Sequence, residues 1–339
     1  MATIRSGATE PRVIFVILNY NGGEDTLACL RSIGGVEYGN YRVIVVDNAS
    51  TDGSADEIER QFPKVLLIRN SVNEGFDGGS NIGIRAALGE GADAVFLLNN
   101  DTVVSPEILR HLTTASLTLP RAGILGPKIY YHDDPQLLWW AGCEKRRSAS
   151  GWLIVYTQEG KKKVDRGQYD EVRRIAGVNG CAMYIRREVF DEVGLFDARY
   201  FMYNDEFDVC DLAERAGWNC YFVPAARLWH KVSRSAGGAG SPILHYLWTR
   251  NWLLCSRKQT SRFLWPMLYY AYVKECYWIY CWLRREGQFA AAEGALAGGW
   301  AAIRNRYGPP PESLDPPLLV SRLAARRYGR RAPVSCGGK

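Results

Sequence analysis

The stretch that decides the fold is Ala94-Val95-Phe96-Leu97-Leu98-Asn99-Asn100-Asp101-Thr102. Its first five residues form a short apolar run, which predicts a buried strand, and the run stops at two amides and a carboxylate. In an open α/β sheet the ligand crevice lies at the carboxyl ends of the strands. An acid in that place can hold Mg²⁺ or Mn²⁺ together with water and the oxygens of a diphosphate. The alternative is an ordinary turn before a helix that starts near Ser105.

Three further apolar runs precede this one, at residues 13–18, 41–46 and 65–68. Helical periodicity follows the first run at residues 24–33, and a second helix ends near residue 61. A glycine-rich loop at 73–81 leads to a third predicted helix at 82–88. Four strand–loop–helix units predict an α/β fold, a Rossmann-like, mostly parallel sheet flanked by helices.

Polar side chains follow each of these strands, and a parallel sheet gathers them at one edge. We therefore expect a nucleotide-sized site at this rim, formed by Asn19, Asp47, Asn48, Asp52, Asn73, Asn81, Asn100 and Asp101. A dehydrogenase is the obvious competitor, but it would carry Gly-x-Gly-x-x-Gly directly after the first strand. Residues 19–23 read Asn-Tyr-Asn-Gly-Gly instead. The later glycines 75, 78 and 79 are expected to permit a tight turn and close packing.

The middle of the chain supplies a second group of acids. Strands are predicted at 122–130 and 178–185, and a polar, irregular stretch separates them at 132–174. Trp139 and Trp140 in that stretch could stack on a sugar or simply pack in the core. A helix that ends near residue 216 carries Asp205, Glu206 and Asp208 in its first turn. These acids either complement the helix dipole or include a catalytic base.

The carboxyl-terminal third is predicted to be helical at 242–262, 263–283 and 290–300. The middle segment is rich in tyrosine and tryptophan and is as long as a membrane span. Pro266, Lys274 and Glu275 interrupt it, and a charge at the bilayer centre costs about 2.5–3.5 kcal/mol. A helix in the membrane interface, or one packed on the preceding domain, is therefore favoured over a span.

The charge of the chain is concentrated at its end. The net charge is +6, and the five arginines and one lysine after Asp315 account for all of it, so the preceding body has 36 basic and 36 acidic residues. A basic tail suits lipid headgroups or nucleic acid, although a solvated end is equally consistent. A nucleic-acid-binding protein would also carry basic residues across its folded body, and the neutral body disfavours it.

Cysteine usage and the amino terminus indicate the compartment. Nine cysteines without a Cys-x-x-Cys pair predict reduced core thiols rather than disulfides or a zinc site. Residues 1–12 are polar, and the apolar run after them is shorter than a signal peptide requires. We expect a cytoplasmic protein.

Taken together, the stretches at 16–21, 45–54, 73–83, 97–102, 200–210 and 229–231 resemble the inverting family 2 glycosyltransferases, especially the rhamnosyltransferase-like branch. The resemblance covers residues 12–235 and implies the GT-A fold. The residue pattern adds an aromatic-rich helical extension at 240–305 and a basic flexible tail at 306–339. It implies transfer of a sugar, with rhamnose from dTDP-rhamnose as the leading donor, to a lipid-linked or cell-surface glycan at the inner membrane face.

The resemblance also assigns roles. It points to Asn19 and Asp47 as nucleotide-binding residues and to Asp101 as the ligand of a divalent metal, Mg²⁺ or Mn²⁺, with His230 beside it. The family motif often has an acid where Asn99 stands, so a single carboxylate serves here. Glu206 takes the position of the catalytic base, with Asp205 as its rival, and Arg250 is a candidate phosphate contact. A non-catalytic nucleotide-sugar-binding protein is the remaining alternative, which the presence of both Asp101 and Glu206 disfavours.

Overall fold

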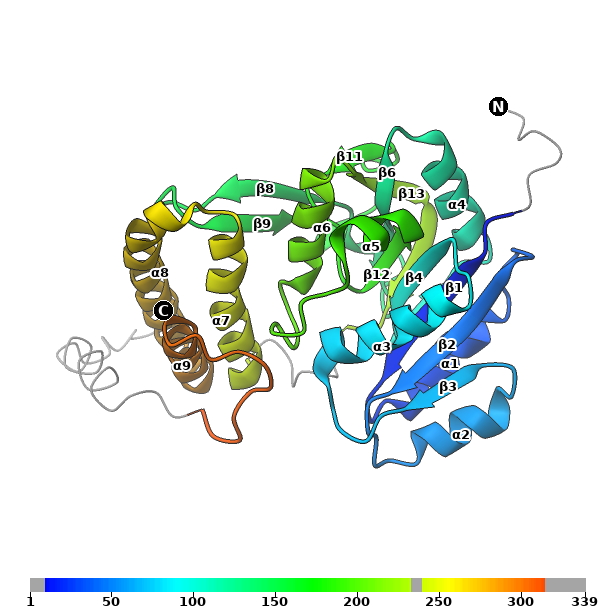
Figure 1. Cartoon of the computed structure of the whole chain (residues 1–339), viewed down its shortest axis with the longest axis horizontal. Helices are drawn as coiled ribbons and strands as arrows, with labels where there is room; N and C mark the ends of the chain where they lie inside the picture. Colours follow the sequence, from blue (N-terminus) through cyan, green and yellow to red (C-terminus); the bar gives the residue numbers. More distant parts are fainter. Residues whose placement is uncertain (1–9, 233–239, 315–339) are drawn as a thin grey trace, which may run out of the picture. The chain divides into compact units, whose positions relative to one another are not determined.

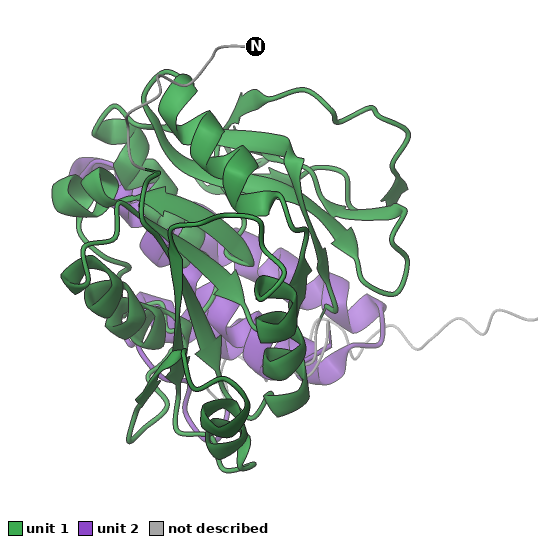
Figure 2. Cartoon of the chain, turned by 90° about the vertical axis from the view of Figure 1, so that its right-hand side faces the viewer, with its two compact units in different colours: residues 1–235 green, residues 236–339 purple. Residues whose placement is uncertain are grey.

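The computed structural model describes residues 10–232 and 240–314 (Figure 1). The chain forms two compact units, residues 1–235 and 236–339 (Figure 2). The predicted basic tail falls largely on residues 315–339, which lie outside the described residues.

The first unit is built on a mixed sheet in the order β10-β7-β6-β12-β4-β1-β2-β3. Its parallel half consists of β1 (Val13–Asn19), β2 (Tyr41–Asp47), β3 (Leu66–Arg69) and β4 (Ala94–Asn99). The central strands are buried at residues 13–17 of β1 and 94–98 of β4, because apolar side chains occupy both faces. In register, Asn19 lies beside Asp47, and Leu18 beside Asn99. The strands therefore end together, which confirms the predicted α/β sheet.

The other half of the sheet begins at β4, where the next strand is antiparallel, and continues through that strand to the remaining ones. β12 (Ala182–Arg186) pairs antiparallel with β4 and with β6 (Ala122–Tyr131), and β13 (Asn219–His230) runs parallel to β6. The short β5 (Thr102–Val104) pairs with the end of β13. Helices α1 (Gly23–Ile33), α2 (Ser54–Gln61), α3 (Gly75–Gly89), α4 (Ile108–Thr118), α5 (Arg187–Val193) and α6 (Asp205–Arg215) connect the strands and cover the sheet (Figure 1).

The glycine-rich stretch differs from the prediction, because most of it belongs to α3 rather than to a loop. A side-chain Cβ added at Gly79 would lie 2.4 Å from Leu18, and one at Gly83 would lie 2.5 Å from Val16. The helix thus rests on β1 at a distance that only glycine permits. The expected close packing is correct, but the glycines act from within the helix.

The stretch at 132–174 also differs from the prediction, because it is not irregular. It contains β7 (Leu137–Trp140), β8 (Cys143–Arg147), β9 (Ile154–Gln158), β10 (Lys163–Val164) and β11 (Arg173–Ile175). These strands were missed because they are short and partly exposed, which leaves little periodic signal. Beyond this stretch, β13 is one continuous strand with a register shift between Val223 and Arg227.

The second unit contains α7 (Pro242–Lys258), a short 3₁₀ turn (Arg262–Leu264), α8 (Trp265–Arg285) and α9 (Phe289–Ile303). A Cβ added at Gly294 or Gly298 would lie 2.2 Å from the carbonyl oxygen of Pro242 or 2.1 Å from that of Tyr246. The glycines therefore let α9 approach α7 closely. Within the described part of the chain, no helix combines the length and hydropathy needed to span a membrane.

The cysteines agree with the predicted reduced thiols. Eight of them fall in the described residues, where all are free and seven are buried. Burial raises the pKa of the Cys29 thiol to about 12. Such thiols serve as small core residues rather than nucleophiles.

Candidate active site

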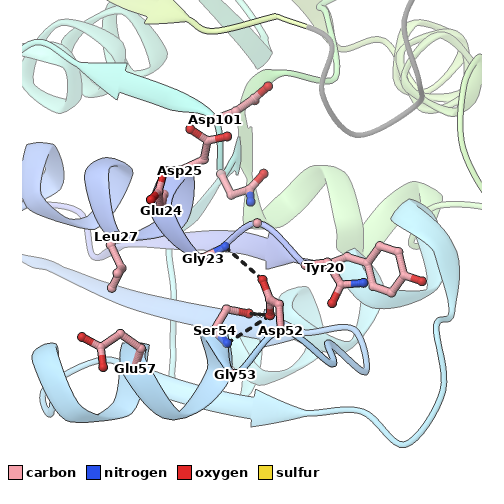
Figure 3. A pocket seen from close by; sticks show the side chains of 13 residues that line it. Tyr20, Gly23, Glu24, Asp25, Leu27, Asp52, Gly53, Ser54, Glu57 and Asp101 are labelled. Carbon is pink, nitrogen blue, oxygen red and sulfur yellow. Dashed lines mark hydrogen bonds between the residues drawn. The ribbon is translucent and has the colours of Figure 1, made fainter.

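A cavity of about 470 Å³ opens at the carboxyl ends of the parallel strands (Figure 3). It is lined by the loop after β1, the first turns of α1, the β2–α2 loop and the residues that follow β4. Five of its lining residues are acids, Glu24, Asp25, Asp52, Glu57 and Asp101, and none is lysine or arginine. An anionic ligand such as a diphosphate would be repelled by such a lining unless a cation accompanied it.

The predicted rim residues Asn19 and Asp47 form the base of this region. The Asn19 amide donates to Asp47 Oδ1 at 2.7 Å and to Ser54 Oγ at 2.8 Å, and it accepts from Thr26 Oγ1 at 2.7 Å. Asp47 also accepts from the backbone N–H of Ser50 at 3.0 Å. Both side chains are buried. They cross-link the loops after β1 and β2, while Tyr20, Asn21 and Asp52 from the same loops line the cavity.

Asn48 and Asn73 cross-link the loop after β2 to the β3–α3 loop. The Asn48 amide nitrogen donates to Asn73 Oδ1 at 2.8 Å and to the carbonyl of Gly75 at 3.0 Å. Its oxygen accepts from the Asn70 amide at 2.9 Å and from the backbone N–H of Glu74 at 3.1 Å. This network fixes the beginning of α3 against the end of β2.

The remaining two amides have different surroundings. Asn100 lines the cavity and donates to Thr26 Oγ1 at 2.9 Å. Asn81 lies in the second turn of α3, where it donates to the carbonyl of Phe196 at 2.8 Å and accepts from its N–H at 3.0 Å. Both functions of the Asn81 amide are therefore used in joining α3 to the segment before α6, and the structure does not bring Asn81 to the cavity.

Asp101 and His230 come together at the corner of the cavity. β5 begins directly after Asp101 and pairs Thr102 with His230 at the end of β13. His230 Nε2 lies 3.0 Å from Asp101 Oδ1 without the alignment of a hydrogen bond, so this buried oxygen has no hydrogen-bond partner among the described residues. Lys231 completes the corner, because its N–H donates to the Asp101 carbonyl at 2.9 Å and its ammonium lies 2.7 Å from Asp25.

These residues fit one side of a divalent-cation site. A buried carboxylate oxygen without a hydrogen-bond donor and a neighbouring imidazole are both suitable ligands. No cluster of three or more protein ligands occurs among the described residues. The remaining ligands would therefore come from a diphosphate and water, which is the usual arrangement for Mg²⁺ in nucleotide sites.

The second group of acids gathers at the start of α6. Asp205 is buried and Glu206 is half-buried. Burial, together with the charge of Asp205, raises the pKa of Glu206 well above its ordinary value, and burial also raises the pKa of Asp205. A third acid, Asp77 in the first turn of α3, is fully buried, and burial together with the charge of Asp205 raises its pKa well above the ordinary value. Asp77 was not singled out from the sequence, because the surrounding glycines suggested a loop.

A tight turn delivers Asp205 and Glu206 to this place. Phe201, Tyr203 and Asn204 all have positive φ, at 65°, 73° and 66°. The N–H of Phe76 donates to the carbonyl of Phe201 at 2.7 Å, which ties the turn to the start of α3. Gly75 has φ of 73°, and a Cβ there would lie 2.5 Å from the Phe201 oxygen. Strained backbone of this kind clusters at functional sites.

The β8–β9 hairpin packs along α6. Tyr156 of β9 stacks on Phe207 with ring centroids 4.1 Å apart, and Lys145 of β8 pairs with the buried Asp211 at 2.5 Å. Part of the stretch that appeared irregular in the sequence therefore supports the helix with the acids. The two tryptophans are also placed: Trp140 is buried, and the Trp139 ring lies 4.5 Å from that of His230.

Arg250 lies in the second unit, buried within α7. Its guanidinium donates to Asn251 Oδ1 at 3.0 Å and to the carbonyl of Gly308 at 2.6 Å, and it lies over the rings of Tyr246 and Tyr307. These contacts fasten the segment after α9 to α7. A phosphate contact by Arg250 stays a prediction.

Comparisons with known proteins agree with this geometry. A model of glycosyl transferase family 2 matches residues 14–194, slightly more than half of the chain. The chain is 29% identical over 246 residues to the N-acetylglucosaminyl-diphospho-decaprenol L-rhamnosyltransferase of Mycobacterium tuberculosis, which covers 66% of this chain and 76% of the relative. It is 26% identical to the dTDP-rhamnosyl transferase RfbF of Shigella flexneri, over 72% of this chain and 79% of that protein.

Solved structures show the same fold. GalNAc-T7 with UDP, GalNAc and Mn²⁺ matches with a TM-score of 0.57 and 18% identity, over 73% of this chain and 48% of that chain. The mannosyltransferase PcManGT from Pyrobaculum calidifontis, in complex with GDP-Man and Mn²⁺, matches with a TM-score of 0.51 and 16% identity, over 95% of this chain and 80% of that chain. At these identities the likeness concerns the fold, and it confirms the predicted GT-A fold.

Proposed function

The chain belongs to glycosyl transferase family 2, and from this premise we propose that it is a metal-dependent, inverting glycosyltransferase that uses a nucleotide-diphosphate sugar. The observation that carries the proposal is the acidic cavity with Asp101 and His230 at its corner. A lining of five acids suits a nucleotide diphosphate only when a divalent cation is bound with it. Two relatives with rhamnosyltransferase names favour rhamnose from dTDP-rhamnose as the donor.

Asp101 and His230 would hold the cation. When bound there, a divalent cation supplies positive charge that stabilises the diphosphate leaving group. Asn19, Asp47, Asn48 and Asn73 fix the loops that line the donor site, and Asn100 with Tyr20 faces the donor directly. Positioned groups of this kind lower the barrier because they need no rearrangement during the reaction.

Glu206 is proposed as the general base. Its raised pKa makes it a stronger proton acceptor than an exposed carboxylate once it is ionised. It would take the proton of the acceptor hydroxyl while that oxygen attacks the anomeric carbon opposite the diphosphate. A single displacement of this kind inverts the anomeric centre. Asp205, which precedes it on the same helical turn, is the rival for this role.

We further propose that the acceptor is a lipid-linked or cell-surface glycan and that the protein works at the inner membrane face. One face of α8 and the preceding turn exposes the large apolar side chains Phe263, Leu264, Met267, Tyr270, Val273, Trp278 and Trp282. The exposed charged residues within 261–285 are Arg262, Lys274 and Arg285, and no acid is exposed there. Aromatic side chains with cations suit the headgroup region of an anionic bilayer.

The function is tested by the release of nucleoside diphosphate from dTDP-rhamnose, UDP-sugars and GDP-sugars, each with Mn²⁺, with Mg²⁺ and with a chelator. We expect release from one donor, lost with the chelator. Binding of every donor is measured in parallel by calorimetry. Binding without release, even when a polyprenyl-diphosphate-linked sugar is supplied as acceptor, would favour the non-catalytic alternative. No binding of any donor would contradict the proposal.

A further inference from the structure

Asp77 is a buried acid without a visible donor. It lies in the first turn of α3 with 0% of its surface exposed, and neither carboxylate oxygen accepts a hydrogen bond from a donor in the described part of the chain. Asp205 Oδ2 is also buried and has no hydrogen-bond donor in the described part of the chain. A buried carboxylate without a donor or counter-charge costs several kcal/mol, so this arrangement requires a proton that satisfies both groups.

The surroundings of the pair are acidic. The charges of Asp205, Glu206 and Asp197 raise the pKa of Asp77, and the charge of Asp208 raises that of Asp205. The titratable neighbours of Glu206 are Tyr203 and Cys143. Burial and these acids raise the pKa of Asp77 well above its ordinary value. Both oxygens of Asp77 and Oδ2 of Asp205 are buried without a donor, so a proton on Asp77 that is donated to Asp205 would satisfy both groups. This assignment makes Asp77 the donor of the pair and Asp205 the acceptor.

The backbone holds the two carboxyls in place. The N–H of Phe76, next to Asp77, donates to the carbonyl of Phe201 at 2.7 Å, and the turn that starts there ends at Asp205. Gly75 allows this approach because any side chain would collide with Phe201. The start of α3 and the turn that leads into α6 are thus held together at this corner.

We propose that Asp77 is a positioning residue that stays protonated and donates a hydrogen bond to Asp205, which keeps the Asp205–Glu206 pair oriented for proton transfer. This inference rests on the proposed function, since it gives the pair on α6 a catalytic task. The proton of the acceptor hydroxyl passes to the α6 pair, and the Asp77 proton stays in its hydrogen bond. Asp77 itself touches no reacting atom.

The first experiment compares Asp77→Asn and Asp77→Ala with the wild type in the pH profile of kcat/KM for nucleoside diphosphate release. The asparagine amide is a permanent neutral donor, so Asp77→Asn should keep activity within about threefold and the same acid limb. Asp77→Ala removes the donor from a buried carboxylate, which should move the acid limb about one pH unit higher. An acid limb that moves lower in Asp77→Asn would show that Asp77 is charged, and equally reduced activity in both variants with unmoved limbs would show a merely structural role. Either result would overturn the proposal.

The second experiment does not depend on activity. A protonated Asp77 in the native state becomes ionised on unfolding, where its pKa is about 3.9. The unfolded state then binds fewer protons, so the wild type loses stability as the pH rises from about 4 towards the native pKa. Asp77→Asn should escape this loss, and its unfolding constant in urea should fall relative to the wild type by about tenfold per pH unit above pH 5, until the native pKa of Asp77 is reached. The exposed Asp133, changed to Asn, is the control and should show no such trend.

The two experiments separate the two failures. If the wild type releases no nucleoside diphosphate from any donor, the proposed function fails, while the urea series still reports the state of Asp77. If Asp77→Asn shows the same pH dependence of stability as the wild type, Asp77 is ionised in the native protein and this inference fails by itself.

Discussion

Glu206 and Asp205 are neighbours on one helical turn with different surroundings. Asp205 is buried against Asp77, whereas Glu206 is half-buried and has Gly180 beside it, which leaves space at its side chain. A base must reach the acceptor hydroxyl. The more accessible carboxylate is therefore the better candidate, and the buried one is better suited to orienting it.

The first residue-level prediction separates these roles. Glu206→Gln should lower kcat by about 10²–10⁴-fold, the usual range for loss of a general base, and should leave the donor affinity unchanged. Asp205→Asn should lower kcat by less. Single-turnover kinetics and donor calorimetry on both variants provide the measurement. A larger loss in Asp205→Asn, with Glu206→Gln still active, would assign the base to Asp205.

The pH dependence of the reaction is the second prediction at this scale. Because burial raises the pKa of Glu206, the base is ionised only above its ordinary range, and kcat/KM should fall with decreasing pH well above pH 4.5. A profile of kcat/KM between pH 5 and 9 measures this limb. An activity that stayed constant down to pH 5 would show that the base has an ordinary carboxylate pKa.

For single residues, the sequence predicts where polar side chains gather better than it predicts what each of them contacts. The resemblance to family 2 glycosyltransferases placed His230 beside Asp101, and the structure brings the two side chains to 3.0 Å. Asp101 could also be located from the apolar run that ends before it. Asn19, Asn48 and Asn73 were expected to contact a ligand; the structure shows Asn19 hydrogen-bonded to Asp47, and Asn48 to Asn73. Their contact with a ligand stays a prediction. Sequence cannot separate a cavity wall from the network behind it, since both need polar residues at the same strand ends.

At the scale of elements, the junction of α3 with the turn before α6 positions Asp205 and Glu206. Gly75 combines a positive φ with contact to Phe201, whereas Gly91 has φ of 79° and no atom within 4 Å of an added Cβ. The two glycines thus separate the cost of the backbone conformation from the cost of a steric clash.

Gly75→Ala should therefore destabilise the protein more than Gly91→Ala. The Gly91 variant should lose about 1 kcal/mol for the left-handed conformation, and the Gly75 variant should lose about 1–3 kcal/mol beyond that because Phe201 must move. Urea unfolding of both variants measures the difference. Equal losses would mean that the turn before α6 adapts freely.

Elements were predictable where packing imposes a period. The parallel strands and most of the helices between them were expected close to their observed bounds, because the central strands β1 and β4 are apolar runs buried on both faces. The start of α3 was not predicted, because glycines close together in a sequence suggest a loop. Only the contact of the helix with β1 shows why it needs glycines. The β8–β9 hairpin was missed because its exposed residues, such as Glu144 and Arg146, give no apolar pattern.

At the scale of the whole molecule, the exposed face of α8 is the feature that bears on location. Trp278 and Trp282 stack on one another with parallel rings 6.5 Å apart and remain exposed. The opposite face of α8 is buried within the second unit. An exposed apolar surface of this kind is typical of an interaction site. The cations on it favour an anionic partner.

The corresponding prediction concerns vesicle binding. The protein should bind vesicles containing phosphatidylglycerol more tightly than vesicles of phosphatidylcholine alone, and Trp278→Ala with Trp282→Ala should weaken that binding by at least about tenfold. Trp300→Ala, which changes a partly exposed tryptophan on α9, is the control. Sedimentation with vesicles measures the fraction bound. Equal binding by the double variant and the wild type would remove α8 from the membrane contact.

The most direct test of the account is the effect of Asp101→Asn on nucleoside diphosphate release from dTDP-rhamnose in the presence of Mn²⁺, with the exposed Asp133→Asn as the control. Asparagine keeps the size of the side chain and removes the charge that the cation needs. We predict that release falls by at least about 100-fold in Asp101→Asn, that chelator reduces the wild type to the same level, and that Asp133→Asn behaves as the wild type. Release that survives both Asp101→Asn and the chelator would contradict a metal-dependent transfer at this corner.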